Sequence, residues 1–307
     1  MQRTSYDHFG QDVREKMSRL FEILNRIYSV EFLSRRLSFY GGTALHSIHF
    51  DLAERLSIDL DFNFRQVGDE DWGEQRDEVD SRIKSILDSL GYLDYRIQPS
   101  YPLNRFDIKY RSSSGLRDSI KIEIGYLRRV PFSRDINYSI SNEYTNNLIC
   151  LSPMKEELLA NKIVTFFSRG GGRDLYDVYA ISRASYNEEW MRKLVLLESV
   201  AILSDSIFES NIHALVNGVR IDTTLTSLLP ITSVPEDIKN SVQAFLQEII
   251  DATSVEEREF IKRFYGSGDF EPELLEFELF NSEARFHSSV LWNLSRLGVL
   301  DSGSGSI

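Results

Sequence analysis

Residues 41–62, GGTALHSIHFDLAERLSIDLDF, are the most informative part of the sequence for the fold of the first half of the chain. A short strand is expected to end at 39–40, because two consecutive glycines, Gly41 and Gly42, then favour a tight turn. Residues 43–49 predict a helix. In residues 58–63, Ile, Leu and Phe alternate with Asp and Asn, which is the two-residue period of a strand.

The same patterns extend the prediction outward. Apolar residues at helical spacing predict one or two helices over 11–37 and another ending near Gly91. Residues 105–111 and 119–127 predict a hairpin with its turn at 112–115. From Ser152 onward the pattern is helical, with Ser152 as the expected N-cap and Pro153 at the first helical position.

These elements predict an α+β protein. We expect a small mixed-sheet domain with flanking helices in residues 1–150, and a mainly helical domain in residues 151–300. In the second domain, Gly170–Gly172 is expected to separate two helices, and several more helices follow over 188–300. Residues 301–307, DSGSGSI, are expected to form a flexible tail.

Charge and composition exclude several classes of protein. The 307 residues carry 35 Lys and Arg against 47 Asp and Glu, a net charge of -12, so a generally basic nucleic-acid coat is excluded. The single cysteine, Cys150, allows no internal disulfide, and its apolar neighbours predict that it is buried. The N-terminal stretch has no apolar core of a signal peptide and no segment is long enough to cross a membrane, so a cytoplasmic protein is expected.

Two aspartates in residues 41–62 indicate a metal-binding or catalytic site. Asp59 and Asp61 are two residues apart on a predicted strand, so their carboxylates leave the same face. Such a pair is destabilised unless a cation lies between its members, and Mg²⁺ prefers oxygen ligands and brings substrate phosphates with it. The apolar neighbours and the glycine turn upstream favour this interpretation over two exposed strand acids. Glu123, which alternates with isoleucines in 119–127, is a candidate third acid or a plain solvent-facing residue.

The sequence resembles the AbiEii/AbiGii-type toxins, which are minimal nucleotidyltransferases of the DNA-polymerase-beta-like superfamily. Residues 41–62 carry the resemblance most specifically, and ELLANKIVTFFSRGGGRDLYDVYAI at 157–181 is a second specific block. KIEI at 121–124 and HSSVLWNL at 287–294 are weaker matches. The resemblance implies a nucleotidyltransferase core whose active site is completed by the first helices of the second domain.

The resemblance also implies roles for individual residues. Gly41, Gly42, Thr43 and Ser57 would bind the nucleotide phosphates. Asp59 and Asp61 would be catalytic and would hold Mg²⁺ or Mn²⁺ together with Glu123, although the wider superfamily has Asp where Glu123 stands. Lys162 would reach the nucleoside triphosphate (NTP).

The acidic residue of the family's last motif would be either Asp174 or Asp177, which are three residues apart and share a helix face. One of the two is expected to bond to Arg173 or to the site. Arg169 and Arg173 flank the glycines of residues 170–172. This loop is either a plain helix connection or a contact for an anion.

Residues 101–134 form a locally basic segment, with eight Lys and Arg against three acids. They either form a solvated strand face or attract an RNA backbone near the site. The candidate RNA or phosphate contacts are Lys121, Arg128, Arg129, Arg169 and Arg173.

The activity we predict is a Mg²⁺-dependent transfer of a nucleoside monophosphate from an NTP to an acceptor hydroxyl. The resemblance favours the 3′ end of tRNA as acceptor, and a toxin opposed by an antitoxin in phage defence by abortive infection. One alternative is transfer to a protein or to a small cationic molecule such as an aminoglycoside. Another is a nucleotide-binding regulatory module without turnover.

Overall fold

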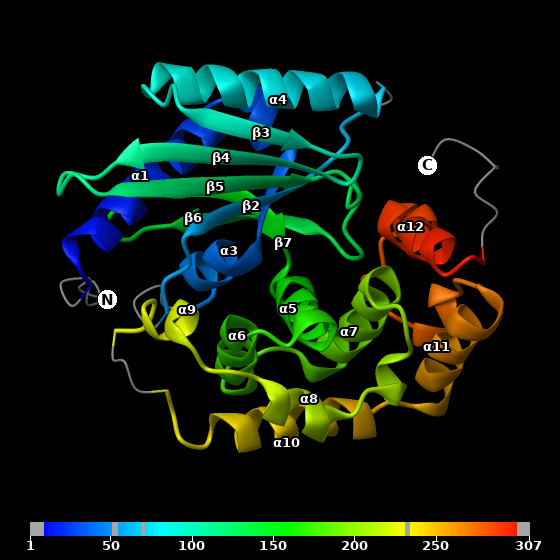
Figure 1. Ribbon diagram of the computed structural model, residues 1–307. Coiled ribbons are helices and arrows are strands. Elements are labelled where there is room, and N and C mark those ends of the chain that lie inside the picture. Colours follow the sequence, from blue (N-terminus) through cyan, green and yellow to red (C-terminus); the bar gives the residue numbers. More distant parts are fainter. Residues whose placement is uncertain (1–8, 51–54, 69–70, 231–233, 300–307) are drawn as a thin grey trace. The chain divides into compact units, whose positions relative to one another are not determined.

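The computed structural model describes residues 9–50, 55–68, 71–230 and 234–299 (Figure 1). The chain divides into two compact units, residues 1–130 with 135–153, and residues 131–134 with 154–307. The first unit contains both sheets and the second is helical, so the predicted α+β class is confirmed. The expected tail, residues 301–307, lies outside the described residues.

The elements of the first unit are α1 (Gln11–Tyr28), α2 (Glu31–Ser34), β1 (Leu37–Tyr40), α3 (Gly41–Ile48), β2 (Asp59–Phe64), α4 (Trp72–Ser89), β3 (Tyr95–Pro99), β4 (Leu103–Arg111), β5 (Arg117–Gly125), β6 (Asp135–Ile140) and β7 (Leu148–Pro153). The helices of the second unit are α5 (Lys155–Arg169), α6 (Gly172–Ser182), α7 (Glu188–Ile202), α8 (Ile212–Gly218), α9 (Thr223–Thr226), α10 (Ile238–Asp251), α11 (Val255–Ser267) and α12 (Ser288–Arg296). Within the described residues, short 3₁₀ helices lie at Ile207–Glu209, Pro272–Leu275 and Ser282–Phe286.

The main sheet has the strand order β1-β2-β5-β4-β3. Its central pair, β2 and β5, is parallel, whereas β1 and β2, β4 and β5, and β3 and β4 are antiparallel. Strands β6 and β7 form a separate antiparallel pair. The parallel central pair positions the candidate site, because it places two segments about 60 residues apart in the chain side by side.

One face of the sheet is covered and apolar. Leu60, Ile122 and Phe106, on β2, β5 and β4, are fully buried. Helices α1 and α4 pack together on this unit and contribute buried apolar faces, among them Leu20 and Ile83 (Figure 1). The alternate residues of β2, β5 and β4 leave the other face and, apart from the buried Asn63, are half-buried or exposed. All polar candidates on these strands share that open face.

Most of the predicted elements of this unit are confirmed, with two corrections. The helix predicted over 43–49 begins at Gly41 itself, so the glycine turn is its first turn. The helix predicted to begin at Pro153 begins at Lys155 with Met154 as N-cap, because Ser152 and Pro153 end strand β7. The Ser152 hydroxyl donates to the carbonyl of Phe39 at 2.8 Å instead of capping a helix.

The β6–β7 pair also explains the lone cysteine. Cys150 lies on β7 and is fully buried, as predicted, and desolvation raises the pKa of its thiol to about 12. A thiol in this state is inert rather than nucleophilic.

The helical unit packs around α5 and α7, which lie side by side in Figure 1. Helix α6 contacts both α5 and α10, and α12 and α11 pack on α7. Gly170 ends α5 in the left-handed conformation, at φ +59°, so the predicted break at Gly170–Gly172 is confirmed. Within the described residues, no helix is both long and apolar enough to span a membrane.

Candidate active site

The three candidate acids lie on two adjacent strands. In the parallel β2–β5 pair, Asp59 is opposite Lys121 and Asp61 is opposite Glu123. All four side chains are half-buried on the open face, whereas Leu60 and Ile122 between them are fully buried on the other face. We call Asp59, Asp61 and Glu123 the carboxylate cluster. The predicted placement of these acids on one face therefore agrees with the structure; their role stays a prediction.

The glycine turn lies directly against this cluster. A Cβ atom at Gly41 would lie 2.1 Å from Oδ2 of Asp61, and one at Gly42 would lie 2.7 Å from Oγ of Ser57. Thr43 ties the same turn to β2, because its hydroxyl donates to the carbonyl of Asp59 at 2.5 Å. The start of α3, where backbone N–H groups have no partner within the helix, is thus held beside Asp61 and Ser57.

Gly41 has two reasons to be glycine, and they predict a large effect of Gly41→Ala. Its φ is +75°, and the added methyl would overlap the Asp61 carboxylate. We expect a loss of about 2–4 kcal/mol in unfolding free energy, measured by urea denaturation, because overpacking adds to the conformational strain. Gly115→Ala is the matched control: φ is +84° there and the space is open, so only about 1 kcal/mol should be lost. Equal losses in the two variants would contradict the close approach to Asp61.

The ammonium group of Lys121 lies within the carboxylate cluster. The Lys121 ammonium lies 3.3 Å from Oδ2 of Asp59 and 3.5 Å from Oε1 of Glu123. Carboxylate oxygens are the donors that Mg²⁺ and Mn²⁺ prefer, so the chemistry of the cluster fits a divalent cation. Within the described part of the chain, no three His, Cys, Asp or Glu side chains are gathered closely enough to ligate a metal as they stand. Lys121, which the sequence predicted as an RNA or phosphate contact, lies within 3.5 Å of two of these acids. Its contact with RNA stays a prediction.

Strand β4 adds an arginine that the sequence did not single out as a site residue. Arg105 is opposite Glu123, and its Nε donates to Oδ1 of Asp107 at 2.8 Å. This hydrogen bond raises the pKa of the guanidinium above its ordinary value, and the charges of Glu123 and Asp59 act in the same direction. The alternation of residues 105–111 with 119–127 could have placed Arg105 here, once their register was known.

The two arginines that follow β5, Arg128 and Arg129, lie in different surroundings. The guanidinium of Arg128 lies 5.8 Å from the ring centroid of Tyr40, the residue just before the glycine turn. Arg129 lies over the ring of Trp72, at 4.5 Å, at the beginning of α4. Arg128 is therefore close to the glycine turn, and Arg129 belongs to the neighbourhood of α4.

In the helical unit, Lys162 and Asp177 form a buried ion pair. Lys162 on α5 is 8% exposed and Asp177 on α6 is 1% exposed, and Nζ lies 3.4 Å from Oδ2. Helices pack with their apolar faces inward, so two charges at such a position are stable only when they neutralise each other. The sequence predicted a role for Lys162 and for either Asp174 or Asp177, but not that Lys162 and Asp177 meet.

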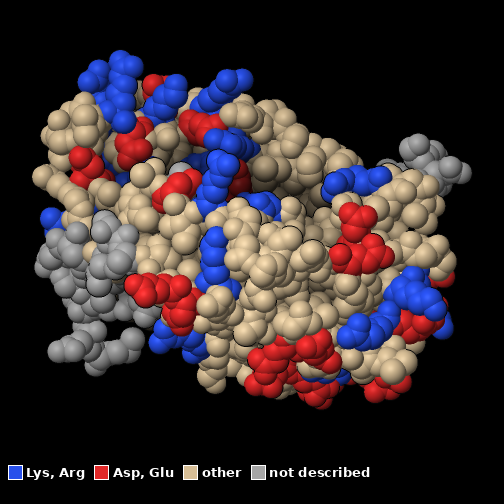
Figure 2. Space-filling model, turned by 60° about the horizontal axis from the view of Figure 1, so that its bottom comes forward, with Lys and Arg blue, Asp and Glu red and all other residues tan. Residues whose placement is uncertain are grey.

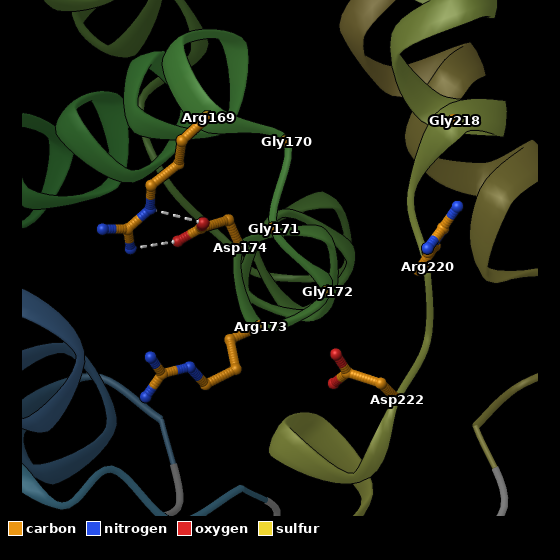
Figure 3. Close-up of a pocket in the computed structure, with 9 residues that line it drawn as sticks. All are labelled: Arg169, Gly170, Gly171, Gly172, Arg173, Asp174, Gly218, Arg220 and Asp222. Atoms are coloured by element: carbon orange, nitrogen blue, oxygen red, sulfur yellow. Dashed lines mark hydrogen bonds and ion pairs between the residues drawn. The ribbon is translucent and has the colours of Figure 1, made fainter.

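The other predicted acid, Asp174, has a different partner. Its two oxygens accept hydrogen bonds from Nε and a terminal nitrogen of Arg169, each at 2.7 Å (Figure 3). The structure thus pairs Asp174 with Arg169 and Asp177 with Lys162. Which acid serves catalysis stays a prediction.

A pocket of about 500 Å³ adjoins the Arg169–Asp174 pair. The glycines of residues 170–172 lie on one side of it and the segment from Gly218 to Asp222 on the other (Figure 3). A Cβ atom at Gly172 would lie 2.9 Å from the carbonyl oxygen of Arg220, so the two segments approach closely. The lining contains Arg169, Arg173 and Arg220 but also Asp174 and Asp222, so its formal net charge is only +1.

Comparison with known proteins gives the context of this site. The family described as "Nucleotidyl transferase AbiEii toxin, Type IV TA system" matches residues 22–265. Among solved structures, the chain resembles MenT4, a nucleotidyltransferase toxin from Mycobacterium tuberculosis H37Rv, with a TM-score of 0.57 and 16% sequence identity over 92% of each chain. An antigenic nucleotidyltransferase-like protein from Paracoccidioides brasiliensis matches with a TM-score of 0.35 and 15% identity, over 55% of this chain and 76% of its own. No curated protein matches.

The family match spans both units and includes the glycine turn, the carboxylate cluster and the Lys162–Asp177 pair. The likeness to MenT4 shows the fold over nearly the whole chain. The chain therefore belongs to the AbiEii family of nucleotidyltransferase toxins from type IV toxin–antitoxin systems.

Proposed function

We propose that this nucleotidyltransferase moves a nucleoside monophosphate from an NTP to a hydroxyl at the 3′ end of tRNA, with Mg²⁺ or Mn²⁺ held by Asp59, Asp61 and Glu123. The observation that carries the proposal is the placement of these acids on one face, directly beside the glycine turn. A divalent cation bound there would neutralise the phosphates and favour ionisation of the attacking hydroxyl.

The chain's own groups account for the remaining chemistry. The N–H groups at the start of α3, with Ser57 beside them, hold phosphate oxygens at the positive end of the helix. The acceptor oxygen forms a bond to the α-phosphorus, the bond from this phosphorus to the bridging oxygen breaks, and pyrophosphate leaves with the electron pair. A carboxylate of the cluster takes the hydroxyl proton. That Lys162 contributes positive charge to the nucleotide stays a prediction.

RNA as acceptor is supported by charge on the open face of the sheet. Lys109, Arg111 and Arg117 are exposed at the far ends of β4 and β5, on the same face as the carboxylate cluster. Arg111 and Arg117 are directly opposite each other, which costs stability, and none of the three forms an ion pair with another described residue. Figure 2 shows Lys and Arg beside Asp and Glu over much of the visible face, so we expect local rather than broad contact with RNA.

Neutralising these strand ends tests the RNA contact. We expect Arg111→Gln/Arg117→Gln to weaken tRNA binding and to lower the slope of log affinity against log salt by about 1.4, because each phosphate contact to a single strand contributes ~0.7. Fluorescence anisotropy with labelled tRNA measures both. The control Lys84→Gln/Lys262→Gln removes the same charge from α4 and α11, where both lysines are exposed. An equal loss in the two double variants would show that net charge, not this surface, attracts the RNA.

The transfer itself is tested with purified protein, Mg²⁺, each labelled NTP in turn, and either total tRNA or a cell lysate. Label on tRNA supports the proposal. Label on a protein band or on a small molecule would show that the acceptor is not tRNA. Nucleotide binding without transfer to any acceptor would overturn it.

The family also suggests an antitoxin as partner. We propose that such a protein opposes this activity in the cytoplasm, where NTPs and tRNA are found. Co-expression with the neighbouring reading frame should then restore growth of cells that express this chain.

A further inference from the structure

The position of Lys121 has a consequence for how the carboxylate cluster binds a cation. Lys121 lies on β5 opposite Asp59 and two residues before Glu123, so its side chain bridges the two parallel strands. Its ammonium is within 3.5 Å of both carboxylates. About a quarter of each of the three side chains is exposed, so these charges are only partly screened by water.

An ammonium and a divalent cation compete for this place. Both are attracted to the same oxygens of Asp59 and Glu123, and at such short separations they would repel each other. The absence of a preformed set of three metal ligands among the described residues fits this arrangement, because Lys121 lies between two of the three acids.

Lys121 has another carboxylate within its row of the sheet. Asp107 on β4 is opposite Lys121 on the side away from Asp59, and it leaves the same open face. Arg105 and Gln98 already donate to Asp107, so this carboxylate is fixed in place. Asp107 also forms an ion pair with Arg105 at 2.7 Å, so a Lys121 ammonium that left Asp59 would share this carboxylate with Arg105.

We propose that Lys121 is an internal counter-cation: it neutralises Asp59 and Glu123 when no divalent cation is bound, and its ammonium leaves them when one binds. The proposal rests on the divalent-cation site of the proposed function. Lys121 is thus a positioning residue that sets the affinity of the empty enzyme for metal. Once displaced, its charge is available to a phosphate on the open face.

The test measures metal binding alone, by calorimetry with Mn²⁺ and without NTP or RNA. We expect Lys121→Met to bind Mn²⁺ about tenfold more tightly than the unaltered protein, because the competing charge is gone. Lys121→Arg keeps the charge and should restore weak binding. Lys109→Met, on the same face of β4 but two rows further from the cluster, should bind as the unaltered protein does.

A second readout comes from thermal unfolding in EDTA. Lys121→Met should melt at a lower temperature than the unaltered protein, because Asp59 and Glu123 then lose the cation that lies within 3.5 Å of both. Added Mn²⁺ should raise its melting temperature by more than it raises that of the unaltered protein. Lys109→Met should show neither change.

Equal or weaker Mn²⁺ binding by folded Lys121→Met would overturn the inference, whether or not the enzyme transfers nucleotides. Tighter binding by Lys121→Met in a protein that transfers nothing would support the inference and count only against the proposed function. The two failures are therefore distinguishable.

Discussion

Asp59→Asn/Asp61→Asn is expected to lower nucleotide transfer at least about 1,000-fold. Asparagine keeps the shape of each side chain and removes its charge, so the cluster loses two of its three anionic ligands. Metal-based charge stabilisation contributes several kcal/mol to a transition state, and about 4 kcal/mol corresponds to a factor of 1,000 in rate. Single-turnover transfer of labelled nucleotide to tRNA measures the loss.

Folding should survive this double substitution, since both side chains lie on the open face and are only half-buried. Removing like charges on one face should leave the melting temperature in EDTA unchanged or slightly higher. Glu74→Gln/Asp94→Asn is the matched control, because both are exposed acids of the first unit outside the carboxylate cluster, and it should transfer nucleotide at the normal rate. Transfer above a tenth of the normal rate in Asp59→Asn/Asp61→Asn would show that these acids do not hold the catalytic cation.

Asp177→Ala is expected to destabilise the helical unit by about 3–5 kcal/mol. The substitution leaves the Lys162 ammonium at 8% exposure without its carboxylate, and an uncompensated buried charge is among the costliest defects in a folded protein. Urea denaturation followed by tryptophan fluorescence measures the loss, because Trp190 and Trp292 both belong to this unit.

Asp174→Ala tests whether the burial of the partner cation sets the cost. Asp174 also loses an ion pair, but its partner Arg169 is 60% exposed and stays hydrated, so we expect a cost of about 1 kcal/mol. The double variant Lys162→Met/Asp177→Leu removes both buried charges and should recover most of the stability lost in Asp177→Ala. A loss in Asp177→Ala no larger than that in Asp174→Ala would contradict the buried pair.

The double variant also separates the two predicted roles of Lys162. Because it folds without the pair, any drop in its NTP affinity reports a lost contact with the nucleotide rather than a loss of structure. Unchanged affinity in a stable Lys162→Met/Asp177→Leu protein would leave Lys162 a purely structural residue.

Local patterns in the sequence were sufficient for most single elements. The two-residue alternation of 58–63 and 119–127 predicted β2 and β5, and the helical spacing of 11–37 predicted α1 and α2. The start of α5 was predicted wrongly because Ser152 and Pro153 are typical of helix starts, whereas pairing with β6 keeps them in strand β7. In that case a tertiary contact overrode a local preference.

The candidate site divides in the same way. That Asp59 and Asp61 share a face and follow a glycine turn could be predicted from the sequence, because a strand's two-residue period and glycine's freedom at positive φ are local properties. Three further features depend on the three-dimensional fold: Glu123 is opposite Asp61, Lys121 lies between two acids, and Lys162 pairs with Asp177. Strand register and helix packing bring together residues that are far apart in the chain. The free energy that fixes this register and packing comes from burying the covered face of the sheet and the core of the helical unit, not from the residues that meet.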